Sequence, residues 1–295
     1  MTGKLSVAVT GGSGFVGRAV LRAMLERGAE VAALTRDGRR LADFQSEVRI
    51  LEGDISNPSA GLLDVLAGHD VLLHLAWDGL PNYRSLNHFE TELPKQYHFL
   101  RELVARGLRS LVVTGTCFEY GMQNGELSES LPCVPDNAYG YAKDSLRRQL
   151  AFLQEQKPFN LTWARLFYVY GRGQGPKSIY SLLSAAVERR DAYFDMSGGE
   201  QLRDYLRIEK VAEYLVRLSS QQHDVGIVNV CSGVPKSLRG IVEKWLSENN
   251  WEIGIRLGRY PYPNYEPFAF WGSARKLHSL LKITETTHAE AGAAP

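Results

Sequence analysis

Residues 9–17, with the sequence VTGGSGFVG, decide the fold of this chain. The segment spaces three glycines at intervals of three residues. These are Gly11, Gly14 and Gly17. The preceding residues 5–9 are aliphatic and β-branched, as in a buried strand, whereas residues 15–26 repeat apolar side chains at helical spacing. The segment therefore predicts a strand, a tight glycine turn and a helix in direct succession.

This arrangement favours a dinucleotide whose pyrophosphate lies at the start of the helix. Gly11 permits the tight turn, Gly14 lets the backbone approach the phosphates, and Gly17 allows the helix to pack closely on the strand. The free N–H groups and the positive end of the helix attract the anion. A glycine-rich turn without a ligand is the alternative. The expected cofactor contacts in this loop are Gly11, Ser13, Gly14, Phe15, Val16 and Gly17.

Length and charge narrow the class of protein. The chain has 295 residues, of which 44% are hydrophobic and 23% charged, so it can bury a large α/β core and a smaller lobe. Its 34 basic and 33 acidic residues nearly cancel, which leaves no overall field to attract nucleic acid or an anionic membrane. We expect neither of these partners.

The cysteines indicate a reducing compartment. Cys117, Cys133 and Cys231 are odd in number and fit no zinc-binding or disulfide pattern. The amino-terminal residues run directly into the first strand, which leaves no room for a signal peptide, and no apolar run is long enough to span a bilayer. We expect reduced thiols, no bound metal and a cytoplasmic location.

The apolar runs alternate between strand and helix along the first part of the chain. Further strands are expected at residues 30–34, 48–51, 70–76, 111–114 and 161–170, and helices at residues 93–106 and 138–154. Alternation of this kind predicts an α/β fold of Rossmann type, with a doubly wound parallel sheet.

The pattern becomes less regular beyond Gly171. We expect a helix at 179–189 and an irregular stretch at 193–201. The chain then returns to the core with a helix at 208–219 and a strand at 226–230. A second lobe is completed by residues 238–248, 252–257 and 272–281. We therefore expect a dinucleotide-binding domain of residues 1–170 plus about 205–232. A smaller α+β substrate-binding lobe of about 171–204 plus 233–283 follows, with a disordered tail at 284–295.

Tyr139 and Lys143 carry the strongest chemical signal. They are four residues apart, so on a helix they share one face, whereas Tyr141 points away from it. An ammonium beside a phenol lowers the pKa of the phenol and makes it a usable acid or base. Thr116 follows the expected fifth strand, at the edge where open α/β sheets bind ligands. Alone, the Tyr–Lys spacing is also typical of a surface pair, and Thr116 of an ordinary strand end.

When these motifs are taken together, the chain resembles the extended short-chain dehydrogenase/reductase family, which contains nucleotide-sugar epimerases, dehydratases and ketoreductases. Seven motifs match in order. They are TGGSGFVG, GDI at 53–55, HLA at 74–76, TGTCFEYG, YGYAK, and the paired segments ARLFYVYGRGQ and RDYLRIEKVA. The resemblance implies that Thr116, Tyr139 and Lys143 are catalytic. It implies cofactor contacts at Asp54, Ile55, Leu75, Ala76, Thr114, Tyr139, Lys143, Leu166 and Phe167, and substrate contacts at Trp77, Thr116, Cys117, Phe118, Tyr168 and Arg203.

The chain departs from the family pattern at several positions. Tyr168 replaces the usual asparagine, Arg172 replaces a proline, and Glu92 stands near a usual asparagine. Dehydratases of the family carry Asp-Glu directly after the catalytic Thr, where this chain has Cys117 and Phe118. Neither residue is a carboxylic acid, so elimination of water is not expected.

The end of the second strand indicates which cofactor is preferred. An acidic residue there hydrogen-bonds the adenosine ribose and repels a 2′-phosphate. This chain has Thr35 at that place, with Arg36, Arg39 and Arg40 close behind. We therefore expect NADP(H), with NAD(H) as the alternative if Asp37 or Asp54 binds the ribose.

These features together predict an NADPH-dependent reductase of a nucleotide-linked 4-keto-6-deoxyhexose. A nucleotide-sugar 4-epimerase with tightly bound NAD is the alternative, and a non-catalytic cofactor sensor comes third because the tyrosine and lysine are both retained. The resemblance also implies a homodimer formed through helices 93–106 and 138–154.

Other chemically suggestive residues have ordinary explanations. We expect His74 to bond to backbone, His98 to lie on the surface and Cys117 to be a small apolar filler. Core packing is expected to explain most of an aromatic cluster, with contact to a sugar or stacking on a base as the alternative for some members. The cluster is formed by Trp77, Tyr83, Tyr260, Tyr262, Tyr265, Phe268, Phe270 and Trp271.

Overall fold

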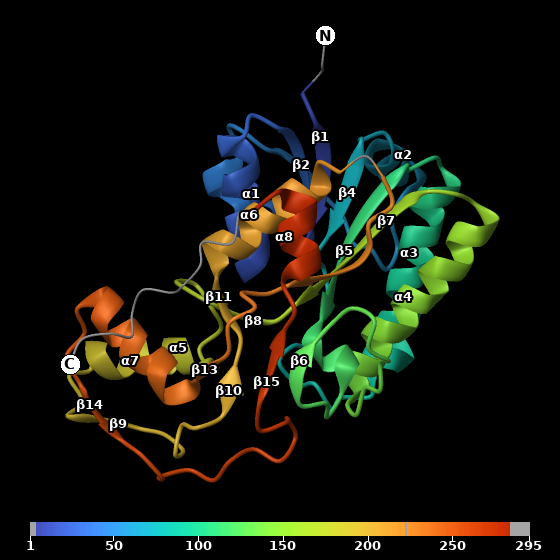
Figure 1. Cartoon of the computed structure of the whole chain (residues 1–295). Helices are drawn as coiled ribbons and strands as arrows, with labels where there is room; N and C mark the ends of the chain where they lie inside the picture. Colours follow the sequence, from blue (N-terminus) through green and yellow to red (C-terminus); the bar gives the residue numbers. More distant parts are fainter. Residues whose placement is uncertain (1–3, 222, 284–295) are drawn as a thin grey trace.

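A seven-stranded parallel sheet forms the centre of the computed structural model, which describes residues 4–221 and 223–283 (Figure 1). The strand order is β12-β7-β5-β4-β1-β2-β3. The strands are β1 (Ser6–Thr10), β2 (Glu30–Thr35), β3 (Arg49–Glu52), β4 (Val71–His74), β5 (Ser110–Thr116), β7 (Asn160–Leu166) and β12 (Gly226–Val230). The order of connection reverses between β1 and β4, and such a point opens a crevice at the carboxyl ends of the strands. The expected doubly wound fold is confirmed.

Helices cover both faces of this sheet because successive strand residues point to opposite sides. Val7 and Val9 of β1 pack with α1 (Phe15–Glu26), α6 (Ile208–Ser219) and α8 (Arg275–Leu281). Ala8 faces the other way, toward the apolar cluster formed with α2 (Ala60–Ala67), α3 (Leu93–Ala105) and α4 (Ala138–Gln156). Figure 1 shows α1 and α6 on one side of the sheet and α3 and α4 on the other.

The expected strand at 161–170 is wrong in its second half. Strand β7 ends at Leu166, which lies opposite Thr116 at the end of β5 and Val230 at the end of β12. Beyond these residues the sheet offers no partner strand. The chain therefore leaves it, and β8 (Tyr168–Tyr170) pairs in parallel with β11 (Tyr205–Arg207) instead.

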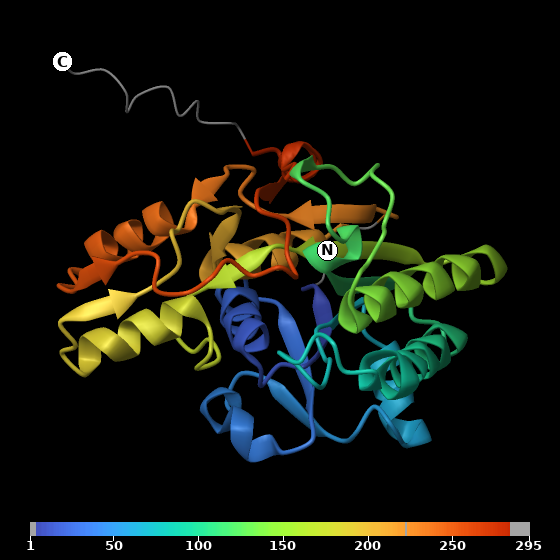
Figure 2. The same cartoon turned by 90° about the horizontal axis from the view of Figure 1, so that it is seen from below.

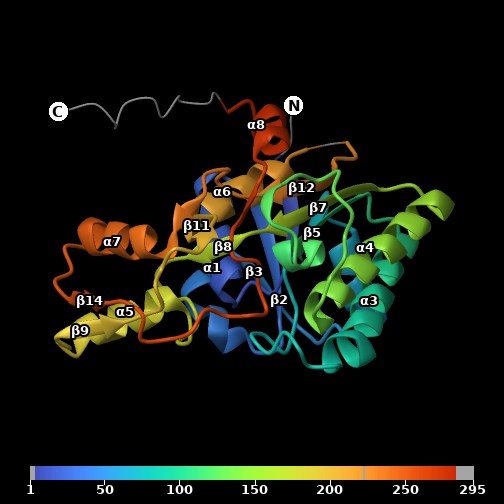
Figure 3. The same cartoon turned by 60° about the horizontal axis from the view of Figure 1, so that its bottom comes forward.

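A separate lobe lies to one side of the sheet (Figure 2). It contains α5 (Ile179–Glu188), β9 (Tyr193–Asp195), α7 (Leu238–Asn249) and β14 (Gly254–Arg256) around an apolar cluster of its own. Strand β9 pairs with β14, although residues 193–201 were expected to be irregular. Figure 3 shows α5 and α7 on the side of the molecule opposite α3 and α4.

The carboxyl-terminal segment also differs from expectation. Helix α8 was expected in the second lobe, but Leu277 and Leu281 join the apolar cluster on the sheet with α1 and α6. Short elements that the sequence did not predict complete the described fold. They are β6 (Gly125–Leu127), β10 (Leu202–Arg203), β13 (Lys236–Ser237), β15 (Phe270–Gly272), the 3-10 helices η1 (Gly38–Phe44) and η3 (Cys117–Tyr120), and the π-helix η2 (His88–Glu92).

The carboxyl-terminal tail and membrane-spanning helices were also subjects of prediction. The tail predicted at 284–295 lies outside the described residues. Within the described residues, no helix is both long and apolar enough to cross a membrane.

Candidate active site

The glycine loop has the close packing that the sequence predicted. Gly11 has a φ of +72°, and a Cβ there would come within 2.8 Å of the Ala76 nitrogen. At Gly17 a Cβ would overlap the Gly11 carbonyl oxygen and lie 2.6 Å from the Gly12 Cα. Gly14 is the extended residue that precedes α1. The loop leaves the N-terminal N–H groups of α1 at the crevice between β1 and β4, which fits a dinucleotide pyrophosphate.

The other expected cofactor contacts lie at or just beyond the carboxyl ends of neighbouring strands, and parallel strands bring these ends to one edge of the sheet. They are Ile55 after β3, Leu75 and Ala76 after β4, Thr114 in β5, and Leu166 and Phe167 at the end of β7. The structure therefore gathers these sequence-distant residues along one edge.

The charged groups near the end of β2 pair with one another. Thr35 is buried and its hydroxyl donates to the Asp37 carbonyl. Arg36 is exposed and pairs through both terminal nitrogens with Asp78, at 3.2 Å each. Arg39 pairs with the Asp37 carboxylate at 2.9 Å and lowers its pKa. The Asp37 carboxylate therefore already has a cationic partner.

Asp54, the other acid expected to contact the cofactor, is held by its own turn. Its carboxylate accepts from the backbone N–H and the hydroxyl of Ser56, at 2.8 and 2.7 Å. These bonds favour the charged form, so the pKa of Asp54 is lowered.

His74 has a structural role beneath the loop. Its ring is fully buried, and it bonds to the Thr10 hydroxyl at 2.9 Å and the Gln96 side-chain oxygen at 2.7 Å. The expectation that its partners are backbone groups is wrong. Burial lowers the pKa of His74 to about 3, so the ring is neutral. Gln96 continues the chain to the buried Glu92. His98 is exposed, as expected.

Helix α4 presents Tyr139 and Lys143 to the sheet edge. Both side chains are buried, whereas Tyr141 is 53% exposed, so the expected division of faces is confirmed. Lys143 Nζ donates to the Thr114 carbonyl oxygen at 2.9 Å. It also lies 4.0 Å from the centroid of the Trp77 ring and 5.9 Å from that of Tyr139.

The expected pKa shift of Tyr139 is wrong in direction. The sequence suggested that Lys143 lowers the pKa of Tyr139, but burial raises it, and Tyr83, Glu119 and Cys117 add to the rise. Burial also lowers the pKa of Lys143 to about 7. Removal of both groups from water therefore outweighs their attraction. At neutral pH Tyr139 carries its proton.

Thr116 is fixed by a network that the sequence did not predict. It is the last residue of β5 rather than the residue after it, and its N–H donates to Glu119 Oε1 at 2.8 Å. Glu119 also accepts from the Trp163 indole N–H at 3.0 Å and from Arg165 Nε at 2.6 Å. Glu119 and Arg165 are fully buried. An arginine within the apolar strand LTWARL was the available signal, because a buried charge needs a partner.

Cys133 and Asp144 complete this buried cluster. With Glu119, they bring three potential metal-ligating atoms within 4.8 Å of one another. Arg165 Nη2 already donates to Cys133 Sγ at 2.8 Å, and Arg147 and Arg148 pair with Asp144. Guanidinium groups therefore supply the positive charge in this cluster.

Three rings surround the phenol of Tyr139. The ring centroids of His88, Tyr83 and Trp77 lie 5.3, 5.7 and 5.9 Å from its own. The sequence had grouped Tyr83 with core aromatics and had not indicated His88. Phe118, an expected substrate contact, lies against Tyr83 at 4.8 Å between centroids.

The expected substrate side lies toward β8 and β10. Arg203 is buried and pairs with Glu266 at 2.9 Å, while it also donates to the Leu202 and Phe268 carbonyls. Tyr168 stacks on Tyr205 at 5.0 Å between centroids. The guanidinium that was expected to reach a diphosphate therefore already has an acidic partner, and Glu266 had no local signal in the sequence.

Two expectations about packing have different outcomes. Cys117 is buried in an apolar cluster with Tyr120 and Phe270, so its role as a filler is confirmed. The expectation that core packing explains most of the aromatic cluster is wrong for four members, which are exposed. They are Tyr260, Tyr262, Tyr265 and Phe268.

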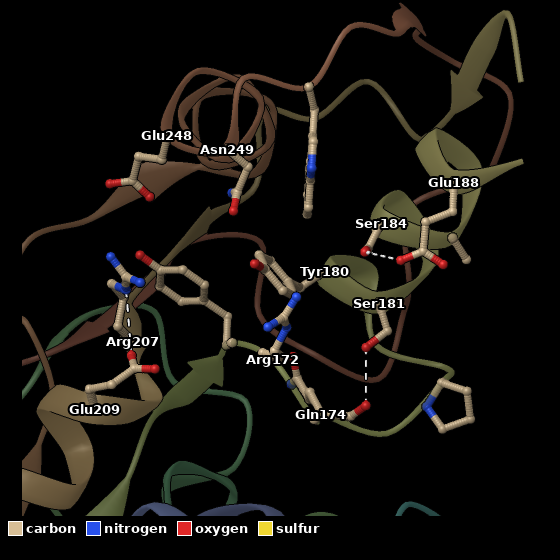
Figure 4. Close-up of a pocket in the computed structure, with 16 residues that line it drawn as sticks. Arg172, Gln174, Tyr180, Ser181, Ser184, Glu188, Arg207, Glu209, Glu248 and Asn249 are labelled. Carbon is tan, nitrogen blue, oxygen red and sulfur yellow. Dashed lines mark hydrogen bonds and ion pairs between the residues drawn. The ribbon is translucent and has the colours of Figure 1, made fainter. Parts of the chain in front are cut away.

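A separate pocket of about 770 Å³ opens between α5, the end of α7 and the loop after β8 (Figure 4). Arg172 and Tyr180 point into it from one side, and Glu248 and Asn249 lie across from them. None of the three expected catalytic residues lines this pocket.

A doubly wound sheet, a glycine loop and a buried Tyr–Lys pair define an enzyme that works with a nicotinamide dinucleotide. The chain belongs to the NAD dependent epimerase/dehydratase family, whose model matches residues 7–231. It is an NAD(P)-dependent oxidoreductase or epimerase of the extended short-chain dehydrogenase/reductase type.

Individual proteins are similar over nearly the whole chain. The dTDP-6-deoxy-L-talose 4-dehydrogenase (NAD(+)) of Aggregatibacter actinomycetemcomitans is 33% identical, over 91% of this chain and 100% of its own length. A UDP-glucose 4-epimerase of Halalkalibacterium halodurans is 23% identical, over 94% of this chain and 90% of its own. The structure of MoeE5 in complex with UDP-glucose and NAD is 26% identical, with a TM-score of 0.78 and 95% and 93% of the two chains covered.

Proposed function

We propose that this enzyme reduces the C4 ketone of a nucleotide-linked 4-keto-6-deoxyhexose. The observation that carries the proposal is the buried Tyr139, which holds its proton at neutral pH and whose ring centroid lies 5.9 Å from Lys143 Nζ. A protonated phenol donates to the oxygen that becomes an alcohol, and this is the proton transfer that reduction needs. The relative from Aggregatibacter is named for oxidation at C4 of a 6-deoxy sugar, which is the reverse of this chemistry.

Each residue of the site has a defined task in this reaction. Thr116 orients the ketone oxygen through its hydroxyl, and Tyr139 gives that oxygen its proton. Lys143, held by the Thr114 carbonyl, supplies a cation beside the phenol. A nicotinamide, when bound, supplies the hydride that reaches C4. Neither Cys117 nor Phe118 is a carboxylic acid, so the adjacent positions provide no group for elimination of water.

We infer a preference for NADP(H) over NAD(H). Thr35 ends β2 where an acid would repel a 2′-phosphate, and it is buried and neutral. Arg36 and Arg40 are exposed in the segment that follows it, where Arg36 pairs with Asp78 and Arg39 with Asp37. The Aggregatibacter relative is named for NAD(+), so the two cofactors must be compared directly.

A 4-epimerase is the second candidate, because the Halalkalibacterium relative bears that name. It uses the same tyrosine and lysine but returns the hydride to the sugar, so the bound cofactor is not consumed. The two candidates therefore differ in whether the cofactor turns over.

One assay separates them. The protein is incubated with NADPH or NADH and a panel of dTDP-, UDP- and GDP-linked 4-keto-6-deoxyhexoses, while nicotinamide absorbance and the sugar products are followed. Stoichiometric cofactor oxidation with formation of a C4 alcohol supports the reductase. Interconversion of two 4-hydroxy sugars without cofactor turnover establishes the epimerase instead. The Tyr139→Phe variant serves as the background.

A further inference from the structure

We propose that Trp77 and His88 act together as a positioning pair for Lys143 and Tyr139. The proposal rests on the catalytic role given to Tyr139 and Lys143 above. Neither Trp77 nor His88 is required to touch the substrate. Trp77 follows β4 and His88 begins η2, so the pair ties the loop between these two elements to helix α4.

The indole face of Trp77 lies against the Lys143 ammonium. Nζ is 4.0 Å from the ring centroid, within the range of a cation–π interaction, and Trp is the strongest partner for such an interaction. The other polar contact of Nζ is the Thr114 carbonyl oxygen at 2.9 Å. The amine is therefore held between a strand carbonyl and an indole face.

His88 fixes the orientation of that indole. Trp77 Nε1 donates to His88 Nδ1 at 3.1 Å, and an indole nitrogen can only donate, so Nδ1 must be the unprotonated nitrogen. His88 Nε2 then carries the proton and donates to the Asn82 carbonyl oxygen at 2.9 Å. The imidazole is fully buried, and its centroid lies 5.3 Å from that of Tyr139. One neutral histidine thus contacts both the indole and the catalytic phenol.

The indole face of Trp77 influences the pKa of Lys143. Glu119 and Glu92 face this amine and favour its charged form, while His74 is neutral and Tyr139 keeps its proton. Burial opposes them and brings the pKa of Lys143 to about 7. A cation–π contact stabilises the ammonium and not the neutral amine. The indole face therefore favours the charged form of Lys143, against the effect of burial.

Fluorescence tests the contact without any assay of activity. The emission of Trp77 is isolated as the difference between the wild type and the Trp77→Phe variant, and is titrated with pH. We expect a transition near pH 7 that disappears when the subtraction is made in a Lys143→Met background. A difference emission that does not change with pH, or a transition that persists without Lys143, overturns the proposal.

Kinetics test the role of His88. His88→Phe keeps an aromatic ring but removes the acceptor of the indole N–H. We expect kcat to fall about ten- to a hundredfold with the KM for the nucleotide sugar nearly unchanged, because positioning and not binding is lost. In a Trp77→Phe background, where no N–H needs an acceptor, the same substitution should have little further effect on kcat.

His98→Phe is the matched control, because His98 is exposed on α3 and contacts Arg101 rather than the site. Near-ultraviolet circular dichroism confirms that each variant is folded. Additive losses from the two substitutions contradict the pairing. Unchanged kcat in His88→Phe contradicts the positioning role even if the fluorescence transition is present. Normal turnover of Tyr139→Phe would instead mean that the proposed function itself has failed.

Discussion

Burial decides the protonation of the two residues to which the proposed reaction assigns the proton transfer. Tyr139 and Lys143 both lie at the sheet edge, out of contact with bulk water. The pKa of the phenol rises and that of the amine falls, because each loses the solvent that stabilises its charged form. The sequence spacing fixes which residues meet, whereas the solvent exposure that sets their proton affinities follows from tertiary packing.

The first prediction concerns Tyr139. Tyr139→Phe removes the proton donor but keeps the ring, so turnover should fall by about two to four orders of magnitude. Cofactor binding and the unfolding midpoint should change little. Tyr141→Phe removes the same hydroxyl from the exposed face of α4 and should leave turnover intact. Near-normal turnover of Tyr139→Phe would exclude this tyrosine as the acid.

The second prediction concerns Lys143 and stability. Its folded-state pKa of about 7 lies below the value in an unfolded chain, so the unfolded state binds more protons between these two values. The contribution of Lys143 to the free energy of unfolding should therefore rise as pH increases above about 7. Urea denaturation should show Lys143→Met gaining most over the wild type at or below pH 7, with the difference shrinking toward pH 10. A difference that is constant over this range would contradict the shift.

The third prediction concerns cofactor choice. Arg36→Ala removes an exposed cation next to Thr35, so the dissociation constant of NADPH should rise by about three- to tenfold while that of NADH changes little. Fluorescence titration with each cofactor measures both constants. Arg49→Ala removes a similar charge at the amino end of β3, on the opposite edge of the sheet, and should alter neither. Tighter binding of NADH than NADPH by the wild type would overturn the inferred preference.

At the scale of elements, the turn from β1 into α1 depends on the absence of a side chain at Gly17. Gly17→Ala places a Cβ against the backbone of Gly11 and Gly12, so we expect a loss of about 1–3 kcal/mol in the free energy of unfolding, together with weaker cofactor binding. Gly61→Ala is the control, because its Cβ position in α2 has no atom within 4 Å apart from its chain neighbours and the backbone of its own helix. Urea denaturation of both variants makes the comparison. Equal stabilities would show that the loop has room to relax.

The sequence predicted elements whose signals are local. Helices α1 and α6 and strand β12 have the expected bounds, because apolar periodicity is read within each segment. The short pairs β8 with β11 and β9 with β14 were not foreseen, since a strand of three residues forms only where a distant partner is available. The candidate site likewise combines residues with a local sequence signal and residues whose partners are distant in the sequence.

Within the candidate site, Thr116, Tyr139 and Lys143 were predicted by motif and spacing. The ion pairs of Arg165 with Glu119 and of Arg203 with Glu266 join residues 46 and 63 positions apart. No local pattern marks such partners, because only the folded chain brings them together. The direction of the Tyr139 shift was missed for the same reason.

At the scale of the whole molecule, α3 and α4 pack side by side and form one flank of the protein (Figure 1). Helix α4 exposes two large aromatic side chains, Tyr141 and Phe152, the latter 66% exposed. They are eleven residues apart, close to three full turns, so they lie on one face of the helix. These two exposed rings suit burial against a second copy of the chain.

The last prediction is therefore a homodimer formed through this flank. Light scattering at micromolar concentration should give twice the mass of the chain, and Phe152→Glu should shift the population to monomer, because the contact would then have to remove a charged group from water. Leu182→Glu is the matched control, since Leu182 is a similarly exposed apolar residue on α5 in the other lobe, and it should leave the mass unchanged. A monomeric mass for the wild type would refute the dimer. A dimer that survives Phe152→Glu but not Leu182→Glu would instead assign the interface to the lobe.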